Sequence, residues 1–121
     1  MTHTSSITGI IRLAHYTSMS TTELQISGSS NTIQLLDNFL LSREIVSFKD
    51  STTLSIPLSG LKKRIPVNSS FNGIVYWQSN TILGIQIASD SMDFLTALCD
   101  FLNSKNVSCA IDKRNKSITI T

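Results

Sequence analysis

Few side chains in this sequence could carry out covalent chemistry. The two histidines are His3, near the start of the chain, and His15, where an apolar segment ends. The two cysteines, Cys99 and Cys109, have neither a metal-ligand spacing nor that of a redox motif. A reactive thiolate needs a cationic neighbour or a helix N-terminus, and Cys99 falls in the middle of a predicted helix. We therefore expect His3 to lie in a frayed terminus and interpret the other three residues as structural.

The acidic residues and the glycines show no catalytic pattern either. Glu23, Glu44, Asp50 and Asp112 fall at predicted turns or element ends, where carboxylates assist solvation and capping. The five glycines are scattered singly, so no glycine-rich loop is predicted to hold a phosphate group. We expect a protein that is not an enzyme, with no catalytic residue, no metal site and no cofactor.

Six of the ten basic residues gather in two short clusters. These are Lys62, Lys63 and Arg64, and then Lys113, Arg114 and Lys116. If the clusters converge in space, they could line a groove for phosphates, and Tyr16, Tyr76 and Trp77 could stack on unpaired bases. The alternative is that the lysines solubilise loops and that Trp77 lies in the core. The net charge of +2 is a mild bias, so single-stranded nucleic-acid binding is the second function predicted.

Two stretches of the sequence share an apolar spacing that is typical of a helix. The first contains Ile33, Leu36, Phe39 and Leu40, and the second contains Leu95, Leu98, Phe101 and Leu102, each 62 positions later. Spacings of three and four residues place such side chains on one face of a helix. Ser29 and Ser91 stand where an N-cap hydroxyl can accept a hydrogen bond from a free backbone N–H.

The segments that flank the predicted helices alternate in polarity, as half-buried strands do. Residues 24–27 precede the first helix and residues 85–88 precede the second, and further strand-like segments lie upstream and downstream of both. We predict a single α+β domain over residues 1–121 that consists of two ββαββ units, approximately residues 7–60 and 71–121. Its sheet is expected to be mostly antiparallel, with both helices packed on it.

The strand after each helix breaks the correspondence between the two units. The first reads apolar at Val46 and Phe48, whereas the second reads apolar at Val107, Cys109 and Ile111, which is one residue out of phase. A slip of one residue would exchange the two faces of a strand. Either a bulge or a small insertion or deletion is expected there, or the similarity ends with the helix.

The first strand of each unit is apolar on both faces, with Ile10 beside Ile11 and with residues 74–77 all apolar or aromatic. Two helices cannot cover both faces of about eight strands, so the second face needs another cover. One solution is a curled or barrel-like sheet whose halves pack on each other. The other is an apolar face that a partner chain covers, which includes a second copy of this chain as a homodimer.

One segment resembles a known family. The stretch GIVYWQSNTILGIQI, residues 73–87, is similar to the end of a PilZ domain, the bacterial receptor for cyclic dinucleotides, where a G-x-V-x-W strand precedes a G-I-x-F strand and a helix. The arginine-rich entry motif and the Asp-x-Ser-x-x-Gly turn of that family do not occur here in order. The resemblance implies a degenerate cyclic-dinucleotide receptor, and it assigns no ligand-binding residue to this chain.

The function that we expect first is non-enzymatic binding of another protein, as an inhibitor or a toxin-immunity protein does. Tyr76, Trp77 and Arg64 are the predicted anchors, because aromatic residues and arginine carry much of the binding energy at interfaces. The sequence has no apolar run of the roughly 20 residues that cross a bilayer and no secretory leader pattern. We therefore expect a cytoplasmic protein with reduced thiols and no membrane partner.

Overall fold

The computed structural model describes residues 1–16, 19–58 and 69–121 of the chain. Strands and helices follow one another in these residues in the predicted order: two strands, a helix and two strands, and then the same again. The elements are β1 (His3–Tyr16), β2 (Met19–Ser27), α1 (Ser30–Ser42), β3 (Phe48–Lys49), β4 (Thr53–Pro57), β5 (Ser70–Gln78), β6 (Thr81–Ala88), α2 (Met92–Ser104), β7 (Cys109–Asp112) and β8 (Ser117–Ile120).

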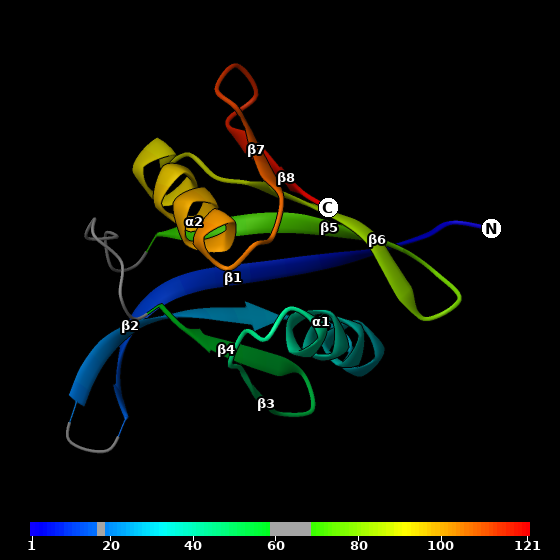
Figure 1. The fold of residues 1–121 in the computed structure, drawn as a ribbon, viewed down its shortest axis with the longest axis horizontal. Helices are drawn as coiled ribbons and strands as arrows, with labels where there is room; N and C mark the ends of the chain where they lie inside the picture. Colours follow the sequence, from blue (N-terminus) through cyan, green and yellow to red (C-terminus); the bar gives the residue numbers. More distant parts are fainter. Residues whose placement is uncertain (17–18, 59–68) are drawn as a thin grey trace.

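The described strands form one open antiparallel sheet of eight strands, in the order β3-β4-β2-β1-β5-β6-β8-β7 (Figure 1). The long strands β1 and β5 pair at its centre, where Thr8 lies opposite Asn72. The α+β class is confirmed, whereas the expectation of a barrel-like sheet whose halves pack on each other is wrong. The reason is the central pairing, because β1 and β5 join the two halves edge to edge and leave β3 and β7 as the outer strands.

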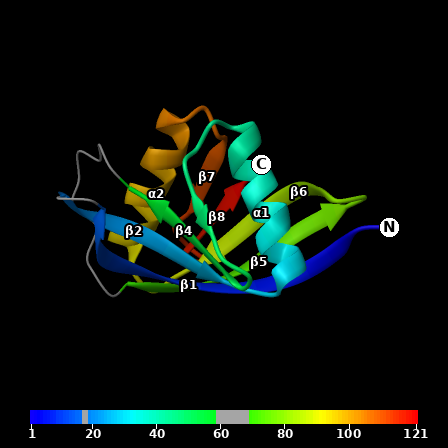
Figure 2. The same ribbon diagram turned by 90° about the horizontal axis from the view of Figure 1, so that it is seen from below.

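Both helices lie on the same side of the sheet, as Figure 2 shows. Alternate side chains of the strands point toward this side and are buried there, in agreement with the period of two expected of half-buried strands. They include Ile7, Ile11, Leu24, Ile26, Leu54, Ile56, Phe71, Val75, Ile85, Ile87, Ile118 and Ile120. Between the helices and the sheet lies an apolar cavity of about 40 Å³, to which α1 contributes Leu36 and α2 contributes Leu98.

The two helices begin in the same way. The Ser29 hydroxyl accepts a hydrogen bond from the Thr32 backbone N–H at 3.3 Å, and the Ser91 hydroxyl accepts one from the Phe94 backbone N–H at 3.2 Å. Each serine therefore satisfies one of the N–H groups that the first turn of a helix leaves free. The two predicted N-caps are confirmed.

The two helices also end in the same way, and this explains the phase mismatch that the sequence shows. The backbone of Glu44 and that of Asn106 are left-handed, with φ of 59° and 62°. The turn that follows buries the next residue, Ile45 in one case and Val107 in the other. Val46 is 66% exposed. The prediction that Val46 is an apolar strand position is therefore wrong, because the left-handed residue turns Ile45 inward in its place.

Candidate functional site

The side of the sheet opposite the helices has no cover in the described part of the chain (Figure 2). We call it the bare face and define it by the side chains of Thr4, Ser6, Thr8, Ile10 and Arg12 on β1, with their cross-strand partners on the neighbouring strands. Because successive side chains of a strand point to opposite faces, these residues alternate with the buried ones. Serine, threonine, asparagine and glutamine predominate on the bare face, as water contact requires.

Two isoleucines interrupt this polar surface at its centre, and Phe48, 53% exposed, lies on the same face at the outer strand β3, opposite Ser55. Ile10 is 37% exposed and Ile74 is 39% exposed. Each lies opposite a serine, Ile10 opposite Ser70 and Ile74 opposite Ser6. Thr8 of β1 and Asn72 of β5 form the central residue pair of the sheet. Ile10 follows Thr8 by two residues and Ile74 follows Asn72 by two residues, so the two isoleucines lie on opposite sides of this pair. They give the centre of the bare face two exposed apolar side chains.

The bare face is hollowed beside one of these isoleucines, Ile74. A depression of about 460 Å³ is lined by residues that include Thr8, Asn72, Ile74, Gln86 and Ala88. A second depression, of about 410 Å³, adjoins the first and shares Thr8, Asn72 and Ala88 with it. The lining of the first depression combines short side chains such as Ser6 and Ala88 with longer ones such as Ile74 and Gln86. A partner's side chain could enter it without any rearrangement of the backbone.

Charged groups on the strands of the bare face are few, and the described ones are held locally. Arg12 lies opposite Glu23, and its Nε atom is 3.2 Å from the Glu23 carboxylate. At the far edge, the Asp112 carboxylate accepts hydrogen bonds from the Asn115 side chain at 2.7 Å and from the backbone N–H groups of Asn115 and Arg114. The side-chain hydrogen bond from Asn115, above all, lowers the pKa of Asp112. The bare face therefore offers hydrogen-bonding groups more than charge.

The predicted anchors Tyr76 and Trp77 are neighbours on β5 but lie on opposite faces of the sheet. Tyr76 belongs to the bare face, where its hydroxyl donates to Gln86 Oε1 at 3.3 Å. Trp77 lies on the helix side near the end of the strand, and its indole N–H donates to Ser5 Oγ at 3.0 Å. The Trp77 ring stacks on His3, the first residue of β1, with centroids 4.5 Å apart, so the expectation of a frayed terminus at His3 is wrong. No single flat partner surface can therefore contact both anchors.

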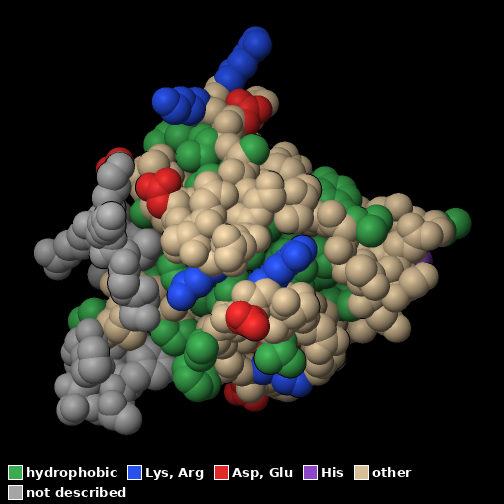
Figure 3. Space-filling view, viewed as in Figure 1, with side chains coloured by type: hydrophobic (Ala, Val, Ile, Leu, Met, Phe, Trp, Pro, Cys, Tyr) green, Lys and Arg blue, Asp and Glu red, His purple; other side chains and the backbone are tan. Residues whose placement is uncertain are grey.

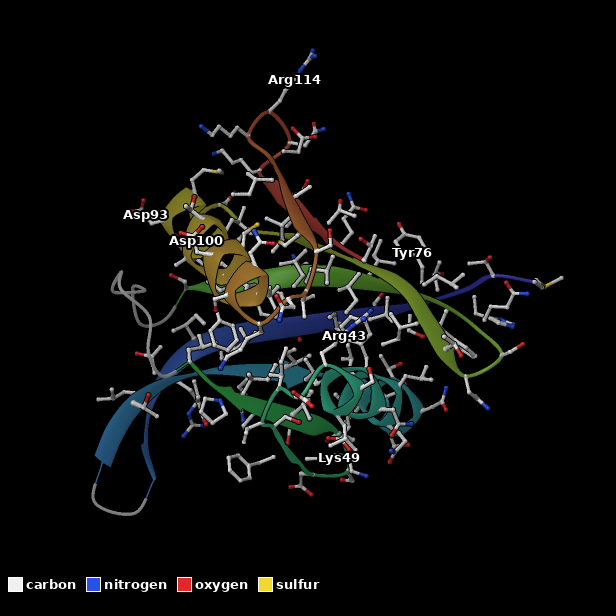
Figure 4. The ribbon with its side chains drawn as sticks, viewed as in Figure 1. Arg43, Lys49, Tyr76, Asp93, Asp100 and Arg114 are labelled. Carbon is white, nitrogen blue, oxygen red and sulfur yellow. The ribbon has the colours of Figure 1, made fainter. Side chains whose placement is uncertain are left out.

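The predicted basic residues are described only in part. Lys62, Lys63 and Arg64 lie outside the described residues, and so does the side chain of Tyr16. Lys113, Arg114 and Lys116 belong to the turn between β7 and β8, and Arg114 points away from the sheet at its tip (Figure 4). The condition that the two clusters converge therefore falls on residues outside the described ranges.

Sequence reasoning did not single out the basic side chains that lie between the two helices (Figure 3). Arg43 stands over the ring of Phe39 at 4.9 Å, and Lys105 stands over the ring of Phe101 at 5.8 Å. The sequence does contain a pattern that predicts these contacts, because in each case a basic residue follows a phenylalanine by four positions. Residues with this spacing are neighbours on a helix. Each cation thus covers the ring of a phenylalanine on its own helix, and Figure 4 shows Arg43 reaching into the space between α1 and α2.

Metal-ligand clusters and membrane-spanning helices are both absent from the described residues. Within them, no three histidine, cysteine, aspartate or glutamate side chains gather as metal ligands would. Neither α1 nor α2, the helices in the described ranges, combines the length and the apolar run that crossing a bilayer requires. Comparisons of the chain with protein-family models, with curated proteins and with solved structures gave no match.

Proposed function

We propose that this protein is a non-enzymatic module that binds another protein through its bare face. The observation that supports the proposal most directly is the exposure of Ile10 and Ile74 at the centre of that face. An antiparallel sheet with one face in water normally places polar residues there, and these two positions depart from that rule. Burial of apolar surface against a partner would contribute about 25 cal/mol per Å². Tyr76, on the same face, is the third anchor that we propose.

The size of the bare face suits a separable partner. Seven spacings of about 4.8 Å across eight strands, and the eight paired residues of the central strands at about 3.4 Å each, give an area of at most roughly 900 Å². A standard protein–protein interface uses about 800 Å² of each partner, and obligate interfaces use considerably more. We infer that the partner associates and dissociates. This protein would inhibit it by covering its functional surface, as an inhibitor or a toxin-immunity protein does.

The chemistry of the bare face favours a partner with little charge. Of the described residues, Arg12 on β1 is already paired with Glu23, and Lys116 lines the second depression together with Asp90. A nucleic acid gains most of its affinity from cations that neutralise its phosphates, and the described strands of the bare face offer few of these. A protein surface with hydrogen-bonding groups and one apolar side chain fits the face and its hollow better. Single-stranded nucleic-acid binding and cyclic-dinucleotide binding stay predictions from the sequence, without an observation that favours them.

We also propose that residues 7–60 and 71–121 are two copies of one ββαββ unit. The strand registers support this. Gly9 pairs with Ile26 in the first unit, and Gly73 pairs with Ile87 at the equivalent place in the second. In the same way, Leu24 pairs with Ile56 in the first unit and Ile85 pairs with Ile120 in the second. Under this relation Ile10 and Ile74 occupy the same position of the unit. A partner would then meet two like halves, related by a local twofold axis at the centre of the bare face.

The proposal can be tested with the full chain carrying an affinity tag and single lysine substitutions. Ile74→Lys and Ile10→Lys place a charge at the centre of the bare face. Leu41→Lys is the matched control, because Leu41 is an aliphatic residue of α1 that is 72% exposed. A companion protein should be recovered with the wild type and with Leu41→Lys, and lost with both isoleucine variants. A loss of at least about 2 kcal/mol, the cost of removing a strong anchor, corresponds to a drop in affinity of roughly 30-fold.

Two results would count against the proposal. If all three variants recover the same companion equally, the bare face is not the docking surface. If the companion is an oligonucleotide whose binding weakens steeply with salt, the protein belongs to the nucleic-acid class. Unfolding curves of each variant establish that a loss of binding does not reflect a loss of fold.

A further inference from the structure

The two cysteines of the sequence meet between α2 and β7. Cys99 lies on the buried side of α2 and is 3% exposed. Cys109 begins β7, is half-buried, and packs against the core on the side of the strand that faces α2. The Cys99 thiol donates to the backbone carbonyl oxygen of Cys109 at 3.1 Å. The chain contains no other cysteine, so any disulfide within it would join these two.

Asn103 holds the two cysteine-bearing segments together. Its side-chain amide N–H group points to the Cys99 sulfur at 3.6 Å, and its carbonyl oxygen accepts the backbone N–H of Cys109 at 3.2 Å. Burial, and after it the neighbouring Cys99 thiol, raise the pKa of Cys109 well above its ordinary value, and Asp100 adds to the effect. Cys109 is therefore a protonated thiol near neutral pH, and it reacts more slowly than an exposed cysteine does.

We propose that Cys99 and Cys109 form a dithiol site that a peroxide oxidises to an intramolecular disulfide. Cys109 reacts first because it is the more exposed of the two. Its sulfur attacks one peroxide oxygen, the O–O bond breaks, and a sulfenic acid and one water form. The Cys99 sulfur then attacks the Cys109 sulfur, the S–O bond breaks, and a second water leaves. The two thiols lose two hydrogen atoms, and hydrogen peroxide is reduced to two waters.

The site is independent of the bare face, because it lies on the helix side of the sheet. A disulfide there would fasten the outer strand β7 to the second half of α2. The reduced and the oxidised protein would then differ in how freely this edge of the sheet can open. A thiol reductant would reverse the change.

The first experiment exposes the folded full chain to hydrogen peroxide, with Cys99→Ala and Cys109→Ala as controls. We expect the wild type to lose two hydrogen masses and to yield a peptide that joins Cys99 to Cys109, both reversed by dithiothreitol. Cys109→Ala should stay unmodified over the same time, because its remaining thiol is buried. Cys99→Ala should accumulate oxidised Cys109 without an internal link. The proposal is overturned if the wild type forms links only between chains, or reaches the sulfinic acid without any link.

A second probe needs no oxidant and covers the case in which the peroxide reaction is slow. Phenylarsine oxide condenses with two neighbouring thiols, so that arsenic bridges both sulfurs and one water is released. The wild type should retain the arsenical through a wash with a monothiol, and both single variants should release it. Equal retention by a single variant, or binding by the wild type only in urea, would mean that the folded chain has no dithiol site.

Discussion

The substitution Gly9→Ala tests the packing at the centre of the sheet. Gly9 pairs with Phe71 of β5 on one side and with Ile26 of β2 on the other. A Cβ atom on residue 9 would lie 2.1 Å from two ring carbons of Phe71 and 2.8 Å from the backbone oxygen of Gln25. Ordinary contacts between carbon atoms lie at about 3.5–4.0 Å, so the ring would have to move by roughly 1.5 Å.

The ring of Phe71 has little room for such a movement. It is 4% exposed and stacks on Phe94, with ring centroids 5.6 Å apart. Overpacking of a core costs about 1–3 kcal/mol. The loss of freedom of the unfolded chain when alanine replaces glycine offsets about 0.4–1 kcal/mol of that cost. We expect the unfolding free energy to fall by about 1–2 kcal/mol, as the difference between these two effects.

The unfolding free energy is measured by urea titration, with circular dichroism as the signal. An unaltered dependence of the unfolding free energy on urea concentration would show that the folded and unfolded states keep their compactness. Gly84→Ala is the matched control, because the atom nearest to its new Cβ is the Ile120 oxygen at 3.3 Å, and we expect a smaller loss. Gly9→Ala combined with Phe71→Leu should lose less than the two single variants added together, since the shorter side chain relieves the clash. A Gly9→Ala protein as stable as the wild type would refute the placement of Phe71 over Gly9.

Two further predictions concern the helix ends and the outer hairpin. Ser29→Ala and Ser91→Ala should each lower the unfolding free energy by about 1 kcal/mol in denaturant titrations, because each removes an N-cap acceptor; a loss from only one of them would show that the two helices are not capped alike. The pKa of Asp112 is lowered in the folded chain, so its contribution to stability is complete above the unfolded-state pKa and is lost as the pH falls through the folded-state value. The difference in unfolding free energy between the wild type and Asp112→Asn should therefore shrink in acid, and a difference independent of pH would mean that Asn115 does not stabilise the carboxylate.

The local elements of the fold could be predicted because their signals are local. The helices follow from apolar spacings of three and four residues and from Ser29 and Ser91, which stand one turn ahead of them. The sheet order could not be predicted in the same way. The pairing of β1 with β5 joins segments that are 60 or more residues apart, and no feature of either strand indicates which strand it pairs with. The barrel expectation failed at this step.

The sequence predicts that apolar residues lie on the uncovered face of the sheet, but it does not predict which aromatic residue faces outward. The adjacent isoleucines Ile10 and Ile11 break the polar alternation, and this indicates an apolar residue on the uncovered side. Tyr76 and Trp77 are both aromatic, so polarity does not tell which of them faces outward, and the strand register shifts between them. The contact between the cysteines depends on β7 lying beside α2, which is a tertiary fact that their spacing does not carry.

The two outermost strands have a consequence for how the protein behaves at high concentration. β3 has two residues and β7 has four, and Lys49 and Asp112 place a charge on each. Short, charged borders are poor templates for the addition of another strand, which is the route by which flat sheets grow into fibrils. The sheet therefore offers a poor border for the addition of further strands, while its broad face stays open to solvent in the described part of the chain.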